Sequence, residues 1–208
     1  YDPTLQVGGD FYDFIELPQG YLGVCIADVV GKGLPAALMM ASIRSALRAY
    51  APTAASPAET VAQANRHMYR DTPVADFATL AYGVFSPDGR NFAYCNAGHL
   101  PPLLLRGERF TELTAGGLAI GIQPDETFEQ DFVALRSGDL IVMVTDGVTE
   151  AMDFQDENFG RVRLLSSIWR HRRLDAQQLA GQILWDVRRF VGLAEQSDDI
   201  TVVVVKAV

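Results

Sequence analysis

The chain has 208 residues and a formal net charge of −9, and 49% of its residues are hydrophobic against 21% charged. This balance is typical of a soluble globular domain with one well-buried core. A chain this acidic is a poor partner for a phosphate backbone, which excludes nucleic acid as the expected ligand. No apolar run reaches the roughly 18 residues that span a bilayer, so we expect a cytoplasmic domain without membrane contact.

The cysteines and the N-terminus narrow the class of protein further. Cys25 and Cys95 both lie in apolar runs, so we expect buried, reduced thiols. Neither begins a Cys-x5-Arg signature, which leaves cysteine-based phosphoester chemistry unsupported. The chain begins Tyr1-Asp2-Pro3-Thr4, without an initiating Met or a basic-then-apolar leader. We therefore expect residues 1–208 to form a single domain excised from a longer multidomain regulator.

The first half of the chain predicts strands, then two helices, then strands again. Apolar residues recur at three- and four-residue steps after Leu34, which is typical of a helix, and prolines separate this helix from the next. The expected elements are a strand within residues 5–16 that is broken by Gly8-Gly9, a strand over 21–27, a helix from Leu34 to before Pro52, a helix over 58–70, and strands over 77–85, 91–96 and 103–106, which we interpret as an antiparallel meander.

The second half adds three strands and two amphipathic helices. Strands are expected over residues 128–135, 140–145 and 200–206, and helices over residues 160–170 and 176–191. Runs of Val-rich strands interrupted by paired helices indicate an α+β layered fold. We therefore predict a central antiparallel β-sandwich flanked by helices on both sides.

Four aspartates stand at the edges of these expected strands. Asp10 follows the Gly-Gly pair, Asp28 and Asp146 each end a buried strand, and Asp198 precedes the last strand. Carboxylates brought together in this way repel one another unless a cation lies between them. Oxygen ligands of this kind favour a hard divalent ion, Mg²⁺ or Mn²⁺.

A turn role is the alternative for any one of these aspartates, because Asp beside Gly is common turn chemistry. That is our interpretation of Asp88 and Asp125, whereas the joint placement of the other four at strand ends favours a metal site. No zinc pattern competes with this prediction. The three histidines, His67, His99 and His171, are isolated from one another and from cysteine.

Five short segments carry a more specific signal. They are Val7-Gly-Gly-Asp-Phe-Tyr-Asp13, Ile26-Ala-Asp-Val-Val-Gly-Lys-Gly-Leu-Pro-Ala-Ala37, Asn96-Ala-Gly-His-Leu-Pro-Pro102, Val144-Thr-Asp-Gly-Val-Thr-Glu150 and Ser197-Asp-Asp-Ile-Thr201. Each is weak alone, but in this order they resemble the motifs of the metal-dependent protein phosphatase (PPM) superfamily, in its bacterial SpoIIE-like branch. The resemblance extends over almost the whole chain.

The resemblance implies two metal ions, Mn²⁺ or Mg²⁺, at one end of the sandwich. By motif match, Asp28 bridges both ions and Val29 offers its backbone carbonyl to one of them. Asp146 and Asp198 complete the shell of the second ion, and Asp10 binds that ion directly or through water. These residues, Asp10, Asp28, Asp146 and Asp198, are the expected catalytic set, with Val29 as a further metal ligand.

Other motif residues carry less certain roles. Asp13 and Asp199 rank below the main ligands, and Asp199 either orients its loop or binds metal. Lys32 either contacts phosphate and the leaving alkoxide or is a solvated loop lysine. The eukaryotic branch carries an arginine just before the first motif, whereas none occurs within residues 1–10. The substrate-binding residues are therefore unknown from the sequence.

Two motif turns are open to similar alternatives. Asn96 and His99 either form a wall of the substrate cleft or a hydrogen-bonded turn. Glu150 is either a carboxylate that supports a metal ligand or the N-terminal charge of a short helix. Gly31 and Gly33 are expected to provide tight turns beside the metals.

The function that the resemblance implies is that of a serine/threonine protein phosphatase. Two ions lower the pKa of a shared water, and the resulting hydroxide attacks phosphorus without a covalent phosphoenzyme. The implied substrate is phosphoserine on a bacterial regulator such as an anti-sigma-factor antagonist, and the implied partner in the same chain is an upstream sensor domain. The alternatives are an interaction module that has kept the fold without turnover, and a hydrolase of small phosphoesters.

Overall fold

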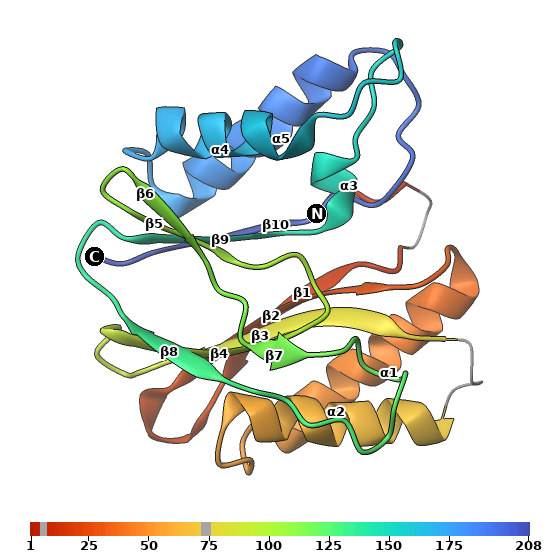
Figure 1. Ribbon diagram of the computed structural model, residues 1–208, viewed down its shortest axis with the longest axis vertical. Coiled ribbons are helices and arrows are strands. Elements are labelled where there is room, and N and C mark those ends of the chain that lie inside the picture. The colour runs from red at the N-terminus through yellow and green to blue at the C-terminus, as the bar shows by residue number, and fades with distance from the viewer. Residues whose placement is uncertain (5–7, 72–75) are drawn as a thin grey trace.

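The computed structural model describes residues 1–4, 8–71 and 76–208. Two β-sheets face each other, and a pair of helices covers the outer face of each sheet (Figure 1). The prediction of an α+β sandwich flanked by helices is therefore confirmed. Val7 of the first motif, and the rest of the predicted strand within residues 5–7, lie outside the described residues.

The larger sheet, here called the lower sheet, holds the first two aspartates. Its strand order is β1-β2-β3-β4-β7, and β8 also pairs with β4. Neighbouring strands are antiparallel except β4 and β7. In the β2–β3 register Asp28 lies directly opposite Thr79. The strands are β1 (Phe11–Glu16), β2 (Leu22–Val29), β3 (Ala78–Phe85), β4 (Asn91–Ala97), β7 (Gly116–Gly117) and β8 (Asp131–Ala134).

The smaller sheet, the upper sheet, is antiparallel throughout and has the order β10-β9-β5-β6. Its central strand β9 is completely buried, because one face packs on the lower sheet and the other on helices. The strands are β5 (Leu103–Arg106), β6 (Arg109–Glu112), β9 (Leu140–Val144) and β10 (Val202–Lys206).

The predicted meander is wrong at its third strand. β3 and β4 do pair, but β5 leaves the lower sheet and pairs with β9 in the upper one. Pro101 and Pro102 lack the N–H that would continue a ladder, and Leu103, Leu104 and Leu105 are all buried, as suits a strand covered on both faces. The sequence did not predict β6 or β7, which are short and carry little apolar pattern.

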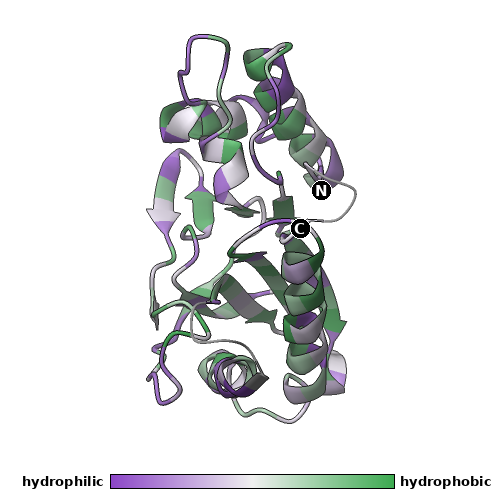
Figure 2. Cartoon of the chain, turned by 90° about the vertical axis from the view of Figure 1, so that its right-hand side faces the viewer, coloured by the Kyte–Doolittle hydropathy of each residue, from purple (hydrophilic) through white to green (hydrophobic). Residues whose placement is uncertain are grey.

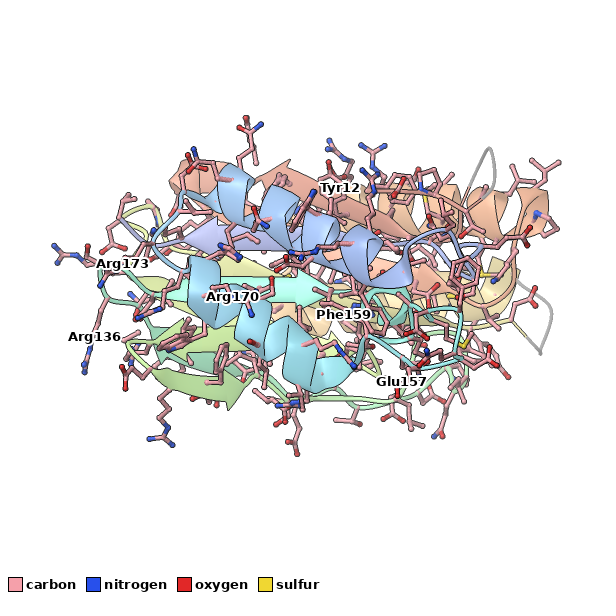
Figure 3. All side chains as sticks on the ribbon, turned by 90° about the horizontal axis from the view of Figure 1, so that it is seen from above. Tyr12, Arg136, Glu157, Phe159, Arg170 and Arg173 are labelled. Atoms are coloured by element: carbon pink, nitrogen blue, oxygen red, sulfur yellow. The ribbon has the colours of Figure 1, made fainter. Side chains whose placement is uncertain are left out.

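The helices cover the outer faces of the two sheets. The helices α1 (Leu34–Tyr50) and α2 (Pro57–Asp71) pack on the lower sheet, whereas α4 (Gly160–His171) and α5 (Ala176–Val191) pack on the upper one. Figure 3, a view onto α4 and α5, shows Phe159 at the start of α4 and Arg170 near its end. The shorter elements are α3 (Asp146–Thr149) and a 3₁₀ turn, Pro18–Gly20.

The apolar residues form three packed layers, one between the sheets and one beneath each helix pair. Figure 2 shows that the strands carry mostly hydrophobic residues. Cys25 and Cys95 are buried free thiols, as predicted, and burial raises the pKa of each to about 12. In the described part of the chain, no helix is both long and apolar enough to cross a membrane.

Candidate metal centre

The four predicted aspartates come from both sheets and meet at one end of the sandwich. Asp10 precedes β1 and Asp28 is the penultimate residue of β2, in the lower sheet. Asp146 begins α3, separated by one residue from the end of β9, and Asp198 precedes β10, on the side of the upper sheet. The end of β2 and the short helix α3 both lie in the right-hand half of the molecule in Figure 1. The fold therefore assembles one acidic site from four distant segments.

Asp10 is the most enclosed of the four and joins the two sheets. It is 3% exposed, and its Oδ2 accepts hydrogen bonds from Thr145 Oγ1 and Thr201 Oγ1, each at 2.7 Å. Burial raises the pKa of Asp10 to about 8, an effect that the two threonine hydroxyls oppose. These two hydroxyls come from the upper sheet, at the ends of β9 and β10. The sequence motifs contained both threonines, but nothing in them indicated this role.

Asp28 and Asp146 are half-buried and face other carboxylates. Burial, followed by the negative charges of Asp146 and Asp198, raises the pKa of Asp28 to about 7. Burial and the charge of Asp198 likewise raise the pKa of Asp146 above its ordinary value. The carboxylates repel one another at short range, which is the property expected of an acidic site that holds cations.

Lys32 reaches the acidic site across its exposed side. Its Nζ lies 3.4 Å from Asp198 Oδ2 and donates a hydrogen bond to the Ser197 carbonyl, although both charged side chains are about half exposed. The loop that carries Lys32 turns at Gly31 and Gly33, whose φ angles of 92° and 74° lie in the left-handed region. The prediction of tight turns at these glycines is confirmed.

Asp199 holds the loop in front of β1. Its Oδ1 accepts a hydrogen bond from Thr4 N at 2.7 Å, and its Oδ2 accepts one from Gly9 N at 2.8 Å and a longer one from Asp10 N at 3.4 Å. Its side chain is buried and occupied by these backbone donors. Of the two sequence interpretations, these contacts favour the one in which Asp199 orients the loop.

Asp13 belongs to a different site. It lies on the face of β1 that packs on α1, where Arg48 and Arg44 donate to its carboxylate at 2.6 Å and 3.0 Å. Burial by itself would raise the pKa of Asp13, but the hydrogen bonds and charges of the two arginines together hold it below the ordinary value. The structure thus separates Asp13 from the four aspartates of the candidate site.

The turn after β4 is held by its own side chains. Asn96 Oδ1 accepts a hydrogen bond from His99 N at 2.8 Å, and Asn96 Nδ2 donates to the His99 carbonyl at 2.9 Å. These bonds favour the hydrogen-bonded-turn interpretation. Glu150 is exposed and caps the C-terminus of α3, where its N–H donates to the Asp146 carbonyl at 2.7 Å. Of the two interpretations of Glu150, the one that places it at a helix N-terminus is therefore wrong.

The donor set fits hydrated divalent ions better than a closed cage. Within residues 1–4, 8–71 and 76–208, no three acidic, histidine or cysteine side chains are arranged as a ready metal shell. Mg²⁺ ordinarily keeps several waters and takes only one or two protein carboxylates, so such a shell is not required. The carboxylates of Asp28, Asp146 and Asp198, which repel one another, are the groups that a bound cation would stabilise.

Solved structures establish the fold class. The PP2C domain of SiaA from Pseudomonas aeruginosa matches with a TM-score of 0.88 at 24% identity, over 99% of this chain and 83% of that one. The RsbU and RsbW domains of a Mycobacterium tuberculosis protein match at 0.77 and 26%, over 97% and 56%. The catalytic domain of the phosphatase PstP, solved with two manganese ions, matches at 0.69 and 15%, over 96% and 91%. The fold is that of PP2C-type (PPM) phosphatase domains.

Sequence relatives give the family. The model of the stage II sporulation protein E (SpoIIE) family matches residues 18–208, and the chain belongs to this family. It is 32% identical over 208 residues to the phosphoserine phosphatase RsbU of Bacillus subtilis, covering 98% of this chain and 61% of RsbU. It is also 32% identical over 197 residues to the protein IcfG of Synechocystis, covering 81% of this chain and 31% of IcfG. The predicted resemblance is confirmed.

Proposed function

We propose that this domain is a divalent-metal-dependent phosphatase that hydrolyses phosphoserine on a protein. One observation carries the proposal: aspartates from both sheets gather at one end of a PP2C-type fold, where burial and mutual repulsion raise the pKa of Asp28 to about 7. Isolated carboxylates in such a place are costly, whereas carboxylates that hold cations are stabilised. The relative RsbU is named as a phosphoserine phosphatase, which supports the same chemistry here.

The proposed ligands are the residues that the sequence motifs indicated. Asp28 would bridge two ions, the Val29 carbonyl would complete one shell, and Asp146 and Asp198 would hold the second ion. Asp10 would act on the second ion directly or through water, because its Oδ2 is already engaged by two threonine hydroxyls. The two manganese ions of PstP, which shares the fold, support Mn²⁺ or Mg²⁺ as the cofactor.

Different residues of this chain would contribute to different parts of the reaction. Bound divalent ions supply a water whose pKa is close to neutral and positive charge that offsets the transferring phosphoryl group. Asp10 is held in place by both sheets, so it can orient that water with little freedom to move. Lys32, at the exposed edge beside Asp198, is close enough to add positive charge to a bound phosphate.

The proposed substrate is a bacterial regulatory protein of the anti-sigma-factor antagonist type, phosphorylated on serine. The supporting observation is the similarity to RsbU, of which the chain spans 61%. The remaining length of that relative leaves room for a sensor domain, which we propose as the upstream partner in the same protein. A cavity of about 160 Å³ beside Asp198, lined in part by Met152 and Arg188, is the place where a protein substrate would meet the site.

The test is an assay of two substrates in the presence of Mn²⁺ and of EDTA. We expect hydrolysis of both p-nitrophenyl phosphate and a serine-phosphorylated antagonist with Mn²⁺, and none with EDTA. Absence of metal-dependent turnover on both substrates would contradict the enzyme assignment and favour an interaction module. Turnover of the small ester alone would instead indicate a small-phosphoester hydrolase. The variant Asp88→Asn changes an aspartate in an exposed turn outside the site, and it should behave as wild type in the same assay.

A further inference from the structure

One buried histidine joins the two sheets at the aspartate end of the sandwich. His99 follows β4, is 6% exposed, and its Nδ1 lies 2.7 Å from Thr79 Oγ1 on β3. Its Nε2 has no hydrogen bond of good geometry within the described ranges, but the ring lies against the backbone carbonyl of Val144, the last residue of β9. The imidazole therefore spans from the lower sheet to the upper sheet.

Each contact of this ring lies close to an aspartate of the candidate site, either across the ladder or along the chain. Thr79 lies directly opposite Asp28 across the β2–β3 ladder. Side chains of directly opposed residues project from the same face with their Cβ atoms about 5 Å apart. Val144 stands two residues before Asp146, on the strand that leads into α3. His99 thus contacts the residue opposite Asp28 in the lower sheet and a residue two positions before Asp146 in the upper sheet.

The ring has little freedom to adjust. Two hydrogen bonds with the Asn96 side chain, one donated and one accepted, fix the backbone of His99, and Gly98 before it adopts a φ of 69°. A side chain at Gly98 would come within 2.8 Å of the Ala119 backbone nitrogen, so the turn is also packed against the loop after β7. The backbone from which the imidazole projects is therefore held in place.

The imidazole is neutral in this position. Burial lowers the pKa of His99 to about 4, although the Val144 carbonyl acts in the opposite direction. A neutral ring has one N–H and one lone pair. A neutral ring whose Nδ1 accepts from the Thr79 hydroxyl carries its proton on Nε2. The ring thus adds no positive charge to compete with a cation.

We propose that His99 is a positioning residue that fixes Asp28 of the lower sheet relative to Asp146 of the upper sheet and thereby sets the affinity of the site for divalent ions. The proposal rests on the proposed function only in taking these aspartates as metal ligands. Asp10 joins the sheets through Thr145 and Thr201, and His99 is a second connection that passes through β3 and β9.

The experiment measures Mn²⁺ binding by electron paramagnetic resonance on the full chain. Removing a group that supports metal ligands typically weakens metal affinity by about 10–100-fold, and we expect this loss in His99→Gln and in Thr79→Val. Thr79→Ser keeps the hydroxyl and should keep wild-type affinity. The matched control is His171→Gln, on α4 beside Asp186 of α5, which should not change affinity.

The double variant tests whether the two residues act together. His99→Gln combined with Thr79→Val should weaken Mn²⁺ binding no more than the stronger single change, because both remove the same contact. Wild-type affinity in both single variants would overturn the proposal, and so would loss of affinity in His99→Gln with none in Thr79→Val. If the His99→Gln variant fails to fold, Thr79→Val still tests the contact between the two residues.

A second measurement separates this proposal from the proposed function. In metal-free protein, the backbone amide resonances of Asp28 and Asp146 should shift together in His99→Gln and stay in place in His171→Gln. Unmoved resonances would overturn the positioning role even if the domain is an active phosphatase. A wild-type chain that binds Mn²⁺ but hydrolyses no phosphoester would contradict the proposed function, and the affinities of the variants would still decide the role of His99.

Discussion

Asp10 and Asp13 lie three residues apart in one motif, yet the fold gives them opposite surroundings. Asp10 faces the space between the sheets, where two threonine hydroxyls hold it and burial raises its pKa to about 8. Asp13 faces α1, where Arg44 and Arg48 bind it and hold its pKa below the ordinary value. Hydroxyl groups contact the Asp10 carboxylate, whereas two guanidinium groups pair with the charge of Asp13.

The difference shows which aspartates are available to a cation. A carboxylate whose charge is already paired with arginine contributes to folding, since removal of the charge leaves two guanidinium groups without their partner. A carboxylate that meets only hydroxyls and other carboxylates is costly to the folded state until a cation binds. The following variants test this contrast, from the largest expected effect to the smallest.

Asp28→Asn should produce the largest effect. Asp28 faces Asp146 and Asp198 and is the proposed bridge between two ions, so we expect metal-dependent phosphatase activity to fall more than about 100-fold. The metal-free protein should stay folded, because the change removes repulsion. Activity against p-nitrophenyl phosphate and thermal unfolding check the two parts. Near-normal activity at every Mn²⁺ concentration would show that Asp28 is not the bridge.

Asp13→Asn should act on stability and leave activity almost unchanged. Replacing a paired carboxylate by an amide weakens its hydrogen bonds to Arg44 and Arg48, which should lower the free energy of unfolding by about 1–2 kcal/mol. Urea unfolding measures this loss, and activity per folded molecule serves as the control. If activity fell as far as in Asp28→Asn, Asp13 would belong to the metal site after all.

The two aspartates should also respond to pH with opposite sign. Asp10 has a folded pKa of about 8 against an ordinary value of 3.8, so the folded state binds the extra proton and metal-free stability falls as pH rises through this range. Asp13 has a lowered folded pKa, so its contribution is present above 3.8 and is lost only as pH falls through the folded value.

Urea unfolding in EDTA across this pH range checks the prediction. Asp10→Asn should flatten the decline between about pH 5 and about pH 8, and Asp13→Asn should not alter it. Saturating Mn²⁺ should also remove the decline in the wild-type protein. A metal-free protein that grows more stable over this range would contradict the assignment of a raised pKa to Asp10.

Lys32→Ala should have the smallest effect on stability. Its ion pair with Asp198 joins two half-exposed side chains, and pairs of this kind contribute at most about 1 kcal/mol. Removing a competing positive charge should leave Mn²⁺ affinity unchanged or higher, as measured by titration. Because Lys32 is proposed to add positive charge to a bound phosphate, the KM for the phosphoester should rise. An unchanged KM would indicate a solvated loop lysine, and a loss of metal affinity would contradict both interpretations.

The elements of secondary structure were largely predictable because their signals are local. The apolar runs of β2 and β9 and the helical periodicity of α1 and α5 are typical of these elements, and each was expected close to its observed bounds. Strand β5 shows the limit of such reasoning. Its residues predict a strand, but which sheet it joins depends on whether β4 or β9 offers the better partner, and this is a tertiary choice.

The sequence by itself determined where the aspartates stand, because a buried apolar run fixes the strand and the acidic residue marks its end. Asp28, Asp146 and Asp198 could be identified on this ground as candidate metal ligands. Only the tertiary structure showed which groups the residues around these aspartates contact. The contacts of Asp199 with the loop before β1, and of His99 with β3 and β9, join segments that are apart in the chain and meet only when the sheets pack.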